Sequence, residues 1–426
     1  MKVAAPIRSR PNVVLAMLLL VYIFNFVDRQ ILAILAAPIQ QDLQLSDTQM
    51  GLLGGIAFAL LYSTLAVPLA WLADRTGRSR VIAVSLALWS LFTALCGVAQ
   101  GFWHIFLARL GVGVGEAGGV APSYALIAEN FPSHRRAFAL SVYSLGIPLG
   151  SAAGVLAGGY LAATVDWRAA FIAVGLAGIA IVPFFKLLVR DRPIEAPRPE
   201  SGEAVHFLQV ARALGAKRSF WLLSFGAASS SMLGYGLAFW LPSLLQRSFG
   251  LDLIATSQFI GAVLLLGGIA GVLGGGWLGD RLGRGDKAWF AWVPAIAFVI
   301  AVPLFALGVM SGSAAFAFIL FLVPQALAYV WLGPVLSAVQ HLMPASQRAT
   351  ASSLFLLINN LIGLGGGIFA LGALSDIIEP VYGNEALRQS MLWSLGLYGL
   401  AALLMALAGP NLRRDWTGDG DGPAVL

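Results

Sequence analysis

The chain has 426 residues, of which 59% are hydrophobic and only 11% charged, with a formal net charge of +6. A soluble domain usually carries about 25% charged residues, so this composition excludes an ordinary water-soluble protein of this length. The sequence pI is near 9.7. The positive charge lies between apolar blocks, which indicates contact with lipid headgroups and argues against a nucleic-acid partner.

Apolar blocks long enough to cross a bilayer, which takes about 20 helical residues, recur along the whole chain. The 49 glycines are typical of helices that pack closely in lipid. We therefore predict an all-α membrane protein with twelve transmembrane helices. The predicted spans are 13–37, 50–73, 81–99, 103–129, 138–164, 169–189, 220–247, 257–279, 288–308, 314–341, 349–376 and 391–409.

The first predicted span carries ionisable side chains inside an apolar helix. Asn25, Asp28 and Arg29 stand at positions i, i+3 and i+4, so they share one helix face. An ionised carboxylate at the bilayer centre costs about 2.5–3.5 kcal/mol. We therefore expect this face to line a polar cavity, in which Asp28 takes up and releases a proton.

The fourth predicted span adds a second charged stripe, because Arg109, Gly113 and Glu116 stand at i, i+4 and i+7. The predicted proton relay consists of Asp28, Glu116, Arg29 and Arg109. In this hypothesis Glu116 holds Arg109 until an anionic head group displaces a carboxylate, which couples substrate binding to protonation. The alternative is a fixed buried salt bridge that tethers spans one and four, although such pairs are rarely net stabilising.

Residues 190–218 form one long polar stretch, rich in Pro, Glu and Arg, which we interpret as a cytoplasmic linker. The predicted domains are an N-terminal six-helix bundle (1–189), this linker, a C-terminal six-helix bundle (219–412) and a cytoplasmic tail (413–426). Within the linker, residues 205–214 mix apolar and polar side chains. This pattern fits either an amphipathic helix on the membrane surface or a solvated helix against the cytoplasmic loops.

The two predicted bundles repeat each other. Residues 72–78 match 278–284 at a separation of 206 residues, and residues 132–137 match 344–349 at a separation of 212. A parallel repeat of six spans is the arrangement of two-half secondary transporters. Glycines recur every fourth residue on the fifth and eighth spans, which indicates either static packing or a sliding contact between these two spans. They are Gly146, Gly150, Gly154 and Gly158, and Gly267, Gly271, Gly275 and Gly279.

The repeat does not extend to the charges. The positions that match Arg109 and Glu116 are Phe321 and Ala328, so the second half lacks the charges of the fourth span. A cavity with one charged and one apolar, aromatic wall suits a substrate with a head and a tail. The predicted cavity residues are Asn25, Arg29, Arg109, Glu116, Tyr235, Phe239, Trp240, Asn359 and Asn360.

Lysine and arginine are concentrated in alternate loops, which sets the predicted orientation. Most of these residues fall on one side of the membrane, which we take to be the cytoplasmic side. The other side holds Arg168, Arg247 and Arg388. We therefore expect a multi-pass protein of the cell inner membrane with both termini in the cytoplasm.

The loop after the second span resembles the signature of the major facilitator superfamily, which reads Leu-Ala-Asp-Arg-Thr-Gly-Arg at residues 72–78 here. Ala70 and Ser79 depart from the family pattern. The resemblance implies that Asp74 sits against the N-terminus of span eleven at a cytoplasmic gate, with Asp280 in the reciprocal place against span five. The alternative is that these charges only fix the topology. The residues assigned to this gate are Asp74, Arg75, Arg78, Arg80, Glu129, Arg136, Asp280, Arg281, Arg284 and Arg348.

More narrowly, the chain resembles the Spinster family. Residues 22–29 of the first span and the motif Gly113-Val-Gly-Glu-Ala with Pro122-Ser123 on the fourth carry this resemblance. It implies export of lysolipids and sphingoid phosphates, often linked to protons. The expected function is proton-coupled transport of an amphiphilic anionic lipid by alternating access. The alternative is a proton-coupled exporter of drugs or small organic anions.

Other classes find little support in the sequence. The four histidines are scattered, so no metal site is predicted, and no phosphate-cradling loop precedes a lysine. A channel is the main rival, but the two-half repeat favours alternating access. We expect no enzyme activity and no cofactor. The expected partners are the amphiphilic substrate, protons and membrane lipids, and we expect the protein to be a monomer.

Overall fold

The computed structural model describes residues 10–191, 207–344 and 347–417, which are helical in almost their whole length and include no strand. Contacts between Cα atoms divide the chain into two units. The first consists of Met1–Leu45 with Ala57–Arg198, and the second of Ser46–Ile56 with Pro199–Leu426. The short segment Ser46–Ile56 thus groups with the second unit, although the chain on both sides of it belongs to the first.

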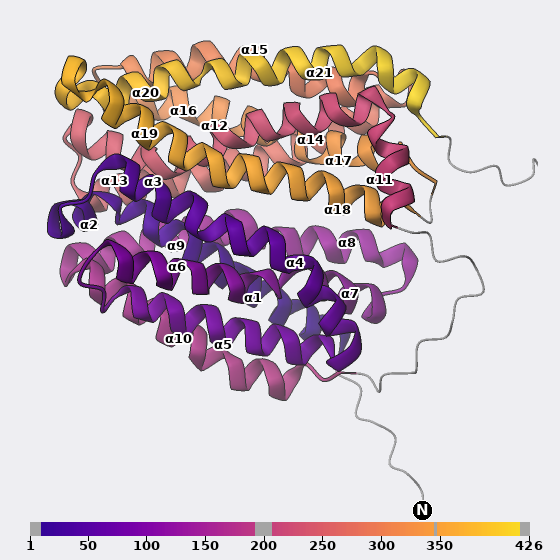
Figure 1. Cartoon of the computed structure of the whole chain (residues 1–426), viewed down its shortest axis with the longest axis horizontal. Helices are drawn as coiled ribbons and strands as arrows, with labels where there is room; N and C mark the ends of the chain where they lie inside the picture. The colour runs from indigo at the N-terminus through magenta and orange to yellow at the C-terminus, as the bar shows by residue number, and fades with distance from the viewer. Residues whose placement is uncertain (1–9, 192–206, 345–346, 418–426) are drawn as a thin grey trace, which may run out of the picture. The chain divides into compact units, whose positions relative to one another are not determined.

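The helices of the first unit are shown in indigo to magenta in Figure 1. In this unit α9 runs along α1, α10 along α5, and α6 packs on α4 and α5. The helices are α1 (Pro11–Ile34), α2 (Ala36–Leu43), α4 (Ala57–Thr76), α5 (Arg78–Cys96), α6 (Phe102–Ala117), α7 (Val120–Asn130), α8 (Ser133–Ser144), α9 (Gly146–Thr164) and α10 (Trp167–Leu188).

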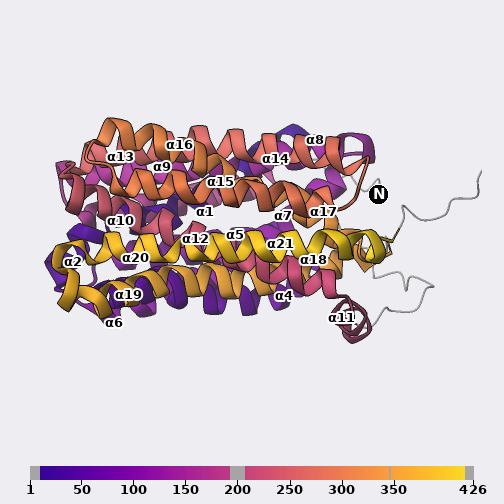
Figure 2. The same ribbon diagram turned by 90° about the horizontal axis from the view of Figure 1, so that it is seen from above.

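In the second unit α12 runs along α21, and α15 packs on both α16 and α21 (Figure 2). Its α-helices are α3 (Asp47–Gly51), α11 (Phe207–Gly215), α12 (Arg218–Phe249), α13 (Leu253–Ala262), α14 (Gly268–Gly283), α15 (Trp289–Met310), α16 (Ala314–Tyr329), α17 (Leu332–Gln340), α18 (Arg348–Asn359), α19 (Gly365–Tyr382), α20 (Ala386–Ser394) and α21 (Gly396–Asp415). The short irregular turns are η1 (Leu52–Ile56), η2 (Val263–Gly267), η4 (Asn360–Leu364) and η5 (Gly383–Glu385).

Each of the twelve predicted spans is a helix or a pair of helices in the described residues. Ten segments are long and apolar enough to cross a membrane. One of them, Thr350–Asp415, holds the last two spans, which the η5 turn separates. The fourth span is divided into α6 and α7 at Gly118 and Gly119, which explains why it falls below the length of a continuous span. The all-helical membrane fold is confirmed.

Three spans contain a single turn of π-helix, η1, η2 and η4. Such turns insert one extra residue into the helical ladder and are frequent at functional sites. The first two lie in the second and eighth spans, which are the repeats of each other. The third begins at Asn360, one of the predicted cavity residues.

The glycine stripes pack within their own units. A Cβ atom at Gly154 would lie 2.8 Å from the Val27 backbone on α1, and one at Gly275 would meet the backbone of Val330. These glycines therefore let α9 approach α1, and α14 approach α16 and α17. The space beside each of these glycines is filled by a helix of the same unit, as the static-packing alternative expects.

The helix expected within the linker is α11, which begins at Phe207. Val210 and Leu214 are buried, and α11 packs against α18 and α12. The indole nitrogen of Trp221 donates to the Gly215 carbonyl oxygen at 2.9 Å, which ties the end of α11 to α12. The apolar face of α11 therefore rests on protein in the second unit.

Candidate functional site

The first unit contains a buried cluster of charged side chains on α1 and α6. Asn25, Asp28, Arg109 and Glu116 are each no more than 2% exposed, as the shared-face spacing of the sequence predicts. Their burial follows from the close packing of the helices that carry them. On α6, Gly113 lies against the Phe58 backbone of α4, where a Cβ atom would come within 2.6 Å.

The ion pair of this cluster joins Arg29 to Glu116. Arg29 Nε donates to Glu116 Oε2 at 2.8 Å, and the Glu116 side chain is fully buried. The sequence hypothesis paired Glu116 with Arg109 instead. Because seven residues of helix separate these two by about 10.5 Å along one axis, a partner on a facing helix reaches Glu116 more directly.

Aromatic rings of the described residues lie against both guanidinium groups, three of them at Arg29 and one at Arg109. The Arg29 guanidinium carbon lies 4.6 Å from the Tyr62 ring centroid and 4.9 Å from that of Phe58. Phe58 is also 5.2 Å from the guanidinium of Arg109. A desolvated cation over an aromatic face gains about 2 kcal/mol. The ring of Phe58 therefore stabilises both positive charges without neutralising either.

Several polar atoms of the cluster make no hydrogen bond to a described residue. They are Asn25 Oδ1, Asp28 Oδ1, Arg109 Nε and Glu116 Oε1. A buried polar group without a partner costs about 1–3 kcal/mol, and such groups in a native structure call for an explanation. A site that exchanges protons and ligands needs unused donors and acceptors of this kind.

Sequence reasoning missed the contribution of α5. Thr93 is buried beside Asp28, and its hydroxyl makes no hydrogen bond to a described residue. A lone threonine within an apolar span carries no distinguishing signal, because helical periodicity does not reveal which helix it faces. Thr93 therefore joins the cluster as a third-helix neighbour of the Asp28 carboxylate.

The first unit also contains a group of aromatic side chains, although the sequence analysis expected the aromatic wall of the cavity in the second half. Tyr22 on α1 stacks on Tyr143 of α8 with ring centroids 4.3 Å apart, and Tyr124 meets Tyr143 edge-on at 5.5 Å. Together with Phe58 and Tyr62, these rings place aromatic groups beside the charged cluster. Charged and aromatic chemistry are thus combined within one unit.

The cavity residues predicted in the second unit fall into two groups. Phe239 and Trp240 are buried, and Trp240 Nε1 donates to the Ile368 carbonyl oxygen at 2.9 Å, so Trp240 joins α12 to α19. Asn359 accepts a hydrogen bond from Ser231 at 2.9 Å and donates to Asn360 at 3.4 Å. Tyr235 is partly exposed on α12. The hydrogen-bonded side-chain amides of Asn359 and Asn360, at the start of η4, are therefore a polar pair among the predicted second-unit cavity residues.

The residues predicted for the cytoplasmic gate are partly brought together. In the first unit Arg78 binds both Asp74, at 2.8 Å, and Glu129. Arg75 lies over the ring of Trp71 at 3.7 Å. The side chain of Arg136 lies outside the described residues.

The other residues predicted for the gate are mostly exposed. Arg80, Asp280, Arg281 and Arg284 are exposed, and Arg281 lies over the ring of Trp277 at 5.2 Å. Arg348 is partly buried at the start of α18.

Asp191, which follows α10, anchors the start of α5. Its carboxylate accepts from the Ser79 backbone N–H at 2.5 Å and from the Ser79 hydroxyl at 2.9 Å. Gly77 has a φ of +113°, and a Cβ atom there would lie 2.6 Å from Asp191 Oδ2. The central glycine of the loop signature is therefore required both by its backbone conformation and by the approach of this carboxylate.

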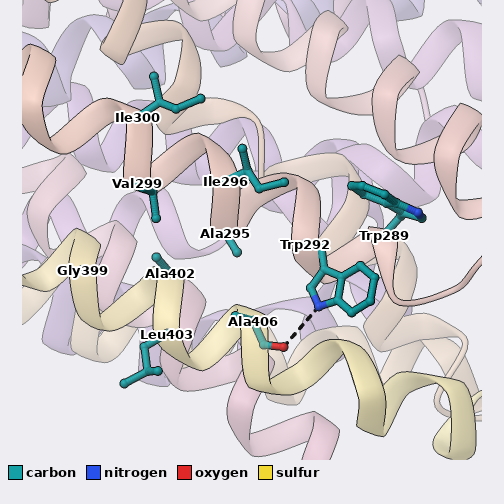
Figure 3. Close-up of a pocket in the computed structure, with 10 residues that line it drawn as sticks. All are labelled: Trp289, Trp292, Ala295, Ile296, Val299, Ile300, Gly399, Ala402, Leu403 and Ala406. Atoms are coloured by element: carbon teal, nitrogen blue, oxygen red, sulfur yellow. Dashed lines mark hydrogen bonds between the residues drawn. The ribbon is translucent and has the colours of Figure 1, made fainter.

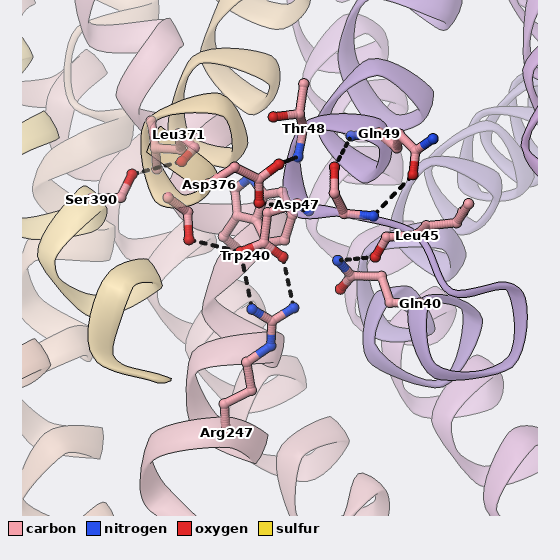
Figure 4. Close-up of polar contacts among 12 residues, drawn as sticks. Gln40, Leu45, Asp47, Thr48, Gln49, Trp240, Arg247, Leu371, Asp376 and Ser390 are labelled. Atoms are coloured by element: carbon pink, nitrogen blue, oxygen red, sulfur yellow. Dashed lines mark hydrogen bonds and ion pairs between the residues drawn. The ribbon is translucent and has the colours of Figure 1, made fainter. Parts of the chain in front are cut away.

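A second polar cluster, not predicted from the sequence, lies in the second unit (Figure 4). Arg247 on α12 donates from both terminal nitrogens to Asp47, at 2.8 and 3.0 Å, and Ser375 donates to Asp47 at 2.7 Å. Asp376 on α19 accepts from the backbone N–H groups of Asp47 and Thr48 at 3.1 and 2.7 Å. We call Asp47, Arg247, Ser375 and Asp376 the outer cluster. Their hydrogen bonds connect the start of α3 to α12 and α19.

No group of three or more His, Cys, Asp or Glu side chains within the described ranges is arranged to hold a metal ion.

Comparison with known proteins places these features in a family context. The profile of the Major Facilitator Superfamily matches residues 18–367. The chain is 33% identical over 401 residues to an MFS-type efflux pump of Mycolicibacterium smegmatis, covering 93% of this chain and 92% of that protein. It is 27% identical over 423 residues to human protein spinster homolog 1, covering 94% and 80% of the two chains.

Two crystal structures of a bacterial homolog of the human lysosomal transporter Spinster are similar over 97% of this chain. The inward-facing, unoccupied form has a TM-score of 0.88 and the inward-facing, occupied form 0.84, both at 28% identity and with 100% of the other chain covered.

Proposed function

We propose that this chain, which belongs to the major facilitator superfamily, is a proton-coupled secondary transporter that moves an amphiphilic anionic lipid by alternating access. A lysophospholipid or a sphingoid phosphate is the expected type of substrate. The observation that carries the proposal is the buried Arg29–Glu116 ion pair at 2.8 Å, with Asp28 and Arg109 buried in the same cluster.

The charges of the cluster suggest how protons and substrate are coupled. Arg29 and Arg109 balance Asp28 and Glu116 when both carboxylates are ionised. One proton, taken up at an unpartnered oxygen of Asp28 or Glu116, leaves one excess positive charge. Because an uncompensated buried charge is costly, an anion then binds more favourably.

Glu116 links protonation to substrate binding, because it is hydrogen-bonded to Arg29. A neutral carboxyl accepts a weaker hydrogen bond than a carboxylate does, so protonation of Glu116 weakens its bond to Arg29. The guanidinium then becomes available to a phosphate, which it can bind through two parallel hydrogen bonds. Loss of the proton restores the ion pair and favours release of the anion.

The lipid-like character of the substrate is supported by the aromatic rings around the charges. Phe26, Phe58 and Tyr62 lie within about 5 Å of the Arg29 guanidinium, and Tyr22 and Tyr143 stack nearby on α1 and α8. Such a surface suits a molecule with a charged head and an apolar chain. The likeness to Spinster proteins supports the same class of substrate.

In the second unit we propose that Tyr235, Asn359 and Asn360 also contact the substrate, because their hydroxyl and amide groups can bind a polar linker between head and chain. At the cytoplasmic gate, we propose that the Arg78 bridge to Asp74 and Glu129 belongs to one of the alternating conformations. The exposed Asp280, Arg281 and Arg284 are the proposed counterpart.

Export of drugs or small organic anions is the second candidate function. It is favoured by the efflux pump of Mycolicibacterium smegmatis, which is 33% identical to this chain over nearly its whole length. The two candidates differ in whether the substrate needs an apolar chain.

The test is transport by the purified protein in proteoliposomes, with and without a pH gradient. The panel contains lysophosphatidic acid, lysophosphatidylglycerol, sphingosine 1-phosphate, cationic dyes, and short-chain anions with the same head groups. The proposal expects gradient-stimulated movement of the long-chain anions and at least tenfold slower movement of their short-chain analogues. Equal movement of short-chain anions, or movement of dyes alone, would support the second candidate and overturn the first.

A further inference from the structure

A groove of about 480 Å³ runs between α15 and α21 on the second unit (Figure 3). Its floor is made of small residues, including Ala295, Gly399 and Ala402, and its sides of branched aliphatic and tryptophan side chains. The polar side-chain atoms among these lining residues are the indole nitrogens of Trp289 and Trp292, and Trp292 Nε1 donates to the Ala406 carbonyl oxygen at 3.2 Å. The lining of the groove is therefore almost entirely apolar.

The groove lies on two membrane-spanning helices, and its sides are open. Ile296, Val299 and Leu403 are 50%, 61% and 56% exposed. A surface of this kind on a membrane-spanning helix is covered by acyl chains. A Cβ atom at Gly399 would meet nothing within 4 Å, so the missing side chain at this position deepens the groove.

The tryptophan end of the groove is bordered by cations. The Arg413 guanidinium lies 5.1 Å from the Trp292 ring and donates to Asp286 through Nε, at 2.9 Å, and Nη2. The Lys287 ammonium lies 5.0 Å from the Trp416 ring and has no ion pair with a described carboxylate. Because Arg413 already neutralises Asp286, Lys287 leaves this end with unbalanced positive charge.

We propose that this groove is a binding site for an anionic phospholipid, with one acyl chain along α15 and α21 and the phosphate at Lys287 and Arg413. Basic pockets at the ends of transmembrane helices bind anionic head groups through the same combination of charge and apolar surface. A net anionic head complements the excess charge of Lys287, whereas a zwitterionic head brings its own cation. This site is separate from the buried cluster of the first unit and does not depend on proton coupling.

The test is native mass spectrometry of the purified protein in equimolar phosphatidylglycerol and phosphatidylcholine with identical acyl chains. The expected result is at least fivefold preferential retention of phosphatidylglycerol as the first bound lipid. Lys287→Gln should reduce this preference to less than twofold. Gly399→Phe, which fills the groove, should reduce retention of the first phosphatidylglycerol at least fivefold.

Two matched variants serve as controls. A Cβ atom at Gly396 also meets nothing within 4 Å, but Gly396 does not line the groove, and Arg281 lies over Trp277 on α14. Gly396→Phe and Arg281→Gln should therefore retain the wild-type preference. Equal retention of the two lipids by the wild type, or an unchanged preference in Lys287→Gln, would show bulk lipid contact alone and overturn the proposal. If Gly399→Phe does not fold, Lys287→Gln decides the question.

Discussion

Arg29 on α1 and Glu116 on α6 form a 2.8 Å ion pair in which the glutamate is fully buried and the arginine side chain only 12% exposed. The second oxygen of Glu116 has no hydrogen-bond partner among the described residues. Oε2 of Glu116 is therefore bound by Arg29, while Oε1 can accept a proton. The proposed coupling rests on this division, and the predictions below follow from it and from the neighbouring structure.

Glu116→Gln should make anion binding independent of pH. The glutamine carbonyl still accepts from Arg29, so the fold is retained, but position 116 no longer titrates and the cluster keeps one excess positive charge whenever Asp28 is ionised. We expect the KM for the anionic substrate at pH 8 to fall several-fold, to the value that the wild type shows at pH 6. Initial rates of uptake over a range of concentrations measure this. Glu385→Gln, which alters a surface pair with Arg388, should leave KM unchanged at both pH values.

Gly150→Ala should destabilise the first unit. A Cβ atom at Gly150 would collide with the backbone of Ile23 and the side chain of Phe26 on α1, and backbone cannot move aside as a side-chain tip can. Overpacking of this kind costs about 1–3 kcal/mol. The expected result is a clear fall in melting temperature in detergent. Gly396→Ala, which meets nothing within 4 Å, should melt like the wild type, and equal melting of both variants would refute the packing argument.

Arg247→Gln should loosen the segment Ser46–Ile56. Asp47 would lose a bidentate ion pair, while the start of α3 would keep its hydrogen bonds with Ser375 and Asp376. We expect faster hydrogen exchange of the backbone amides of residues 47–56, measured by mass spectrometry. Arg168→Gln breaks a comparable pair with Asp42 and serves as the control. Unchanged exchange in Arg247→Gln would mean that the outer cluster does not hold this segment.

Asp286→Asn should change the melting temperature by the same amount at every pH from 5 to 8. The hydrogen bonds from Arg413 lower the pKa of Asp286 to about 2, below the usual value of about 3.9. Its contribution to stability is thus present above pH 4 and lost only as the pH falls towards 2. We expect the difference in melting temperature between Asp286→Asn and the wild type to be constant from pH 5 to 8. A difference that changes within this range would contradict the assignment.

The sequence analysis predicted the spans, the repeat and the residues of the buried cluster, because apolar length and helical spacing depend on local sequence. It did not predict that Arg29, and not Arg109, binds Glu116. Spacing shows which residues share a helix face but not which helix lies opposite. The partner of a buried charge is decided by tertiary packing.

The same limit explains the other features that sequence reasoning missed. The glycine stripes indicated close helix contacts, but nothing in them distinguishes α1 from another partner of α9. Asp47 and Asp376 lie 329 positions apart, and neither belongs to a recurring motif. Thr93 is an ordinary residue of an apolar span until α5 places it beside Asp28.

The central claim is that Asp28 takes up the transported proton and passes it to Glu116, and Asp28→Asn tests it most directly. The measurement is uptake of the anionic lipid into proteoliposomes with and without an imposed pH gradient. Asp252→Asn is the control, because asparagine can replace aspartate as the N-cap of α13. We predict that Asp28→Asn abolishes stimulation by the gradient while Asp252→Asn retains it. Undiminished gradient-driven uptake by Asp28→Asn would contradict the account.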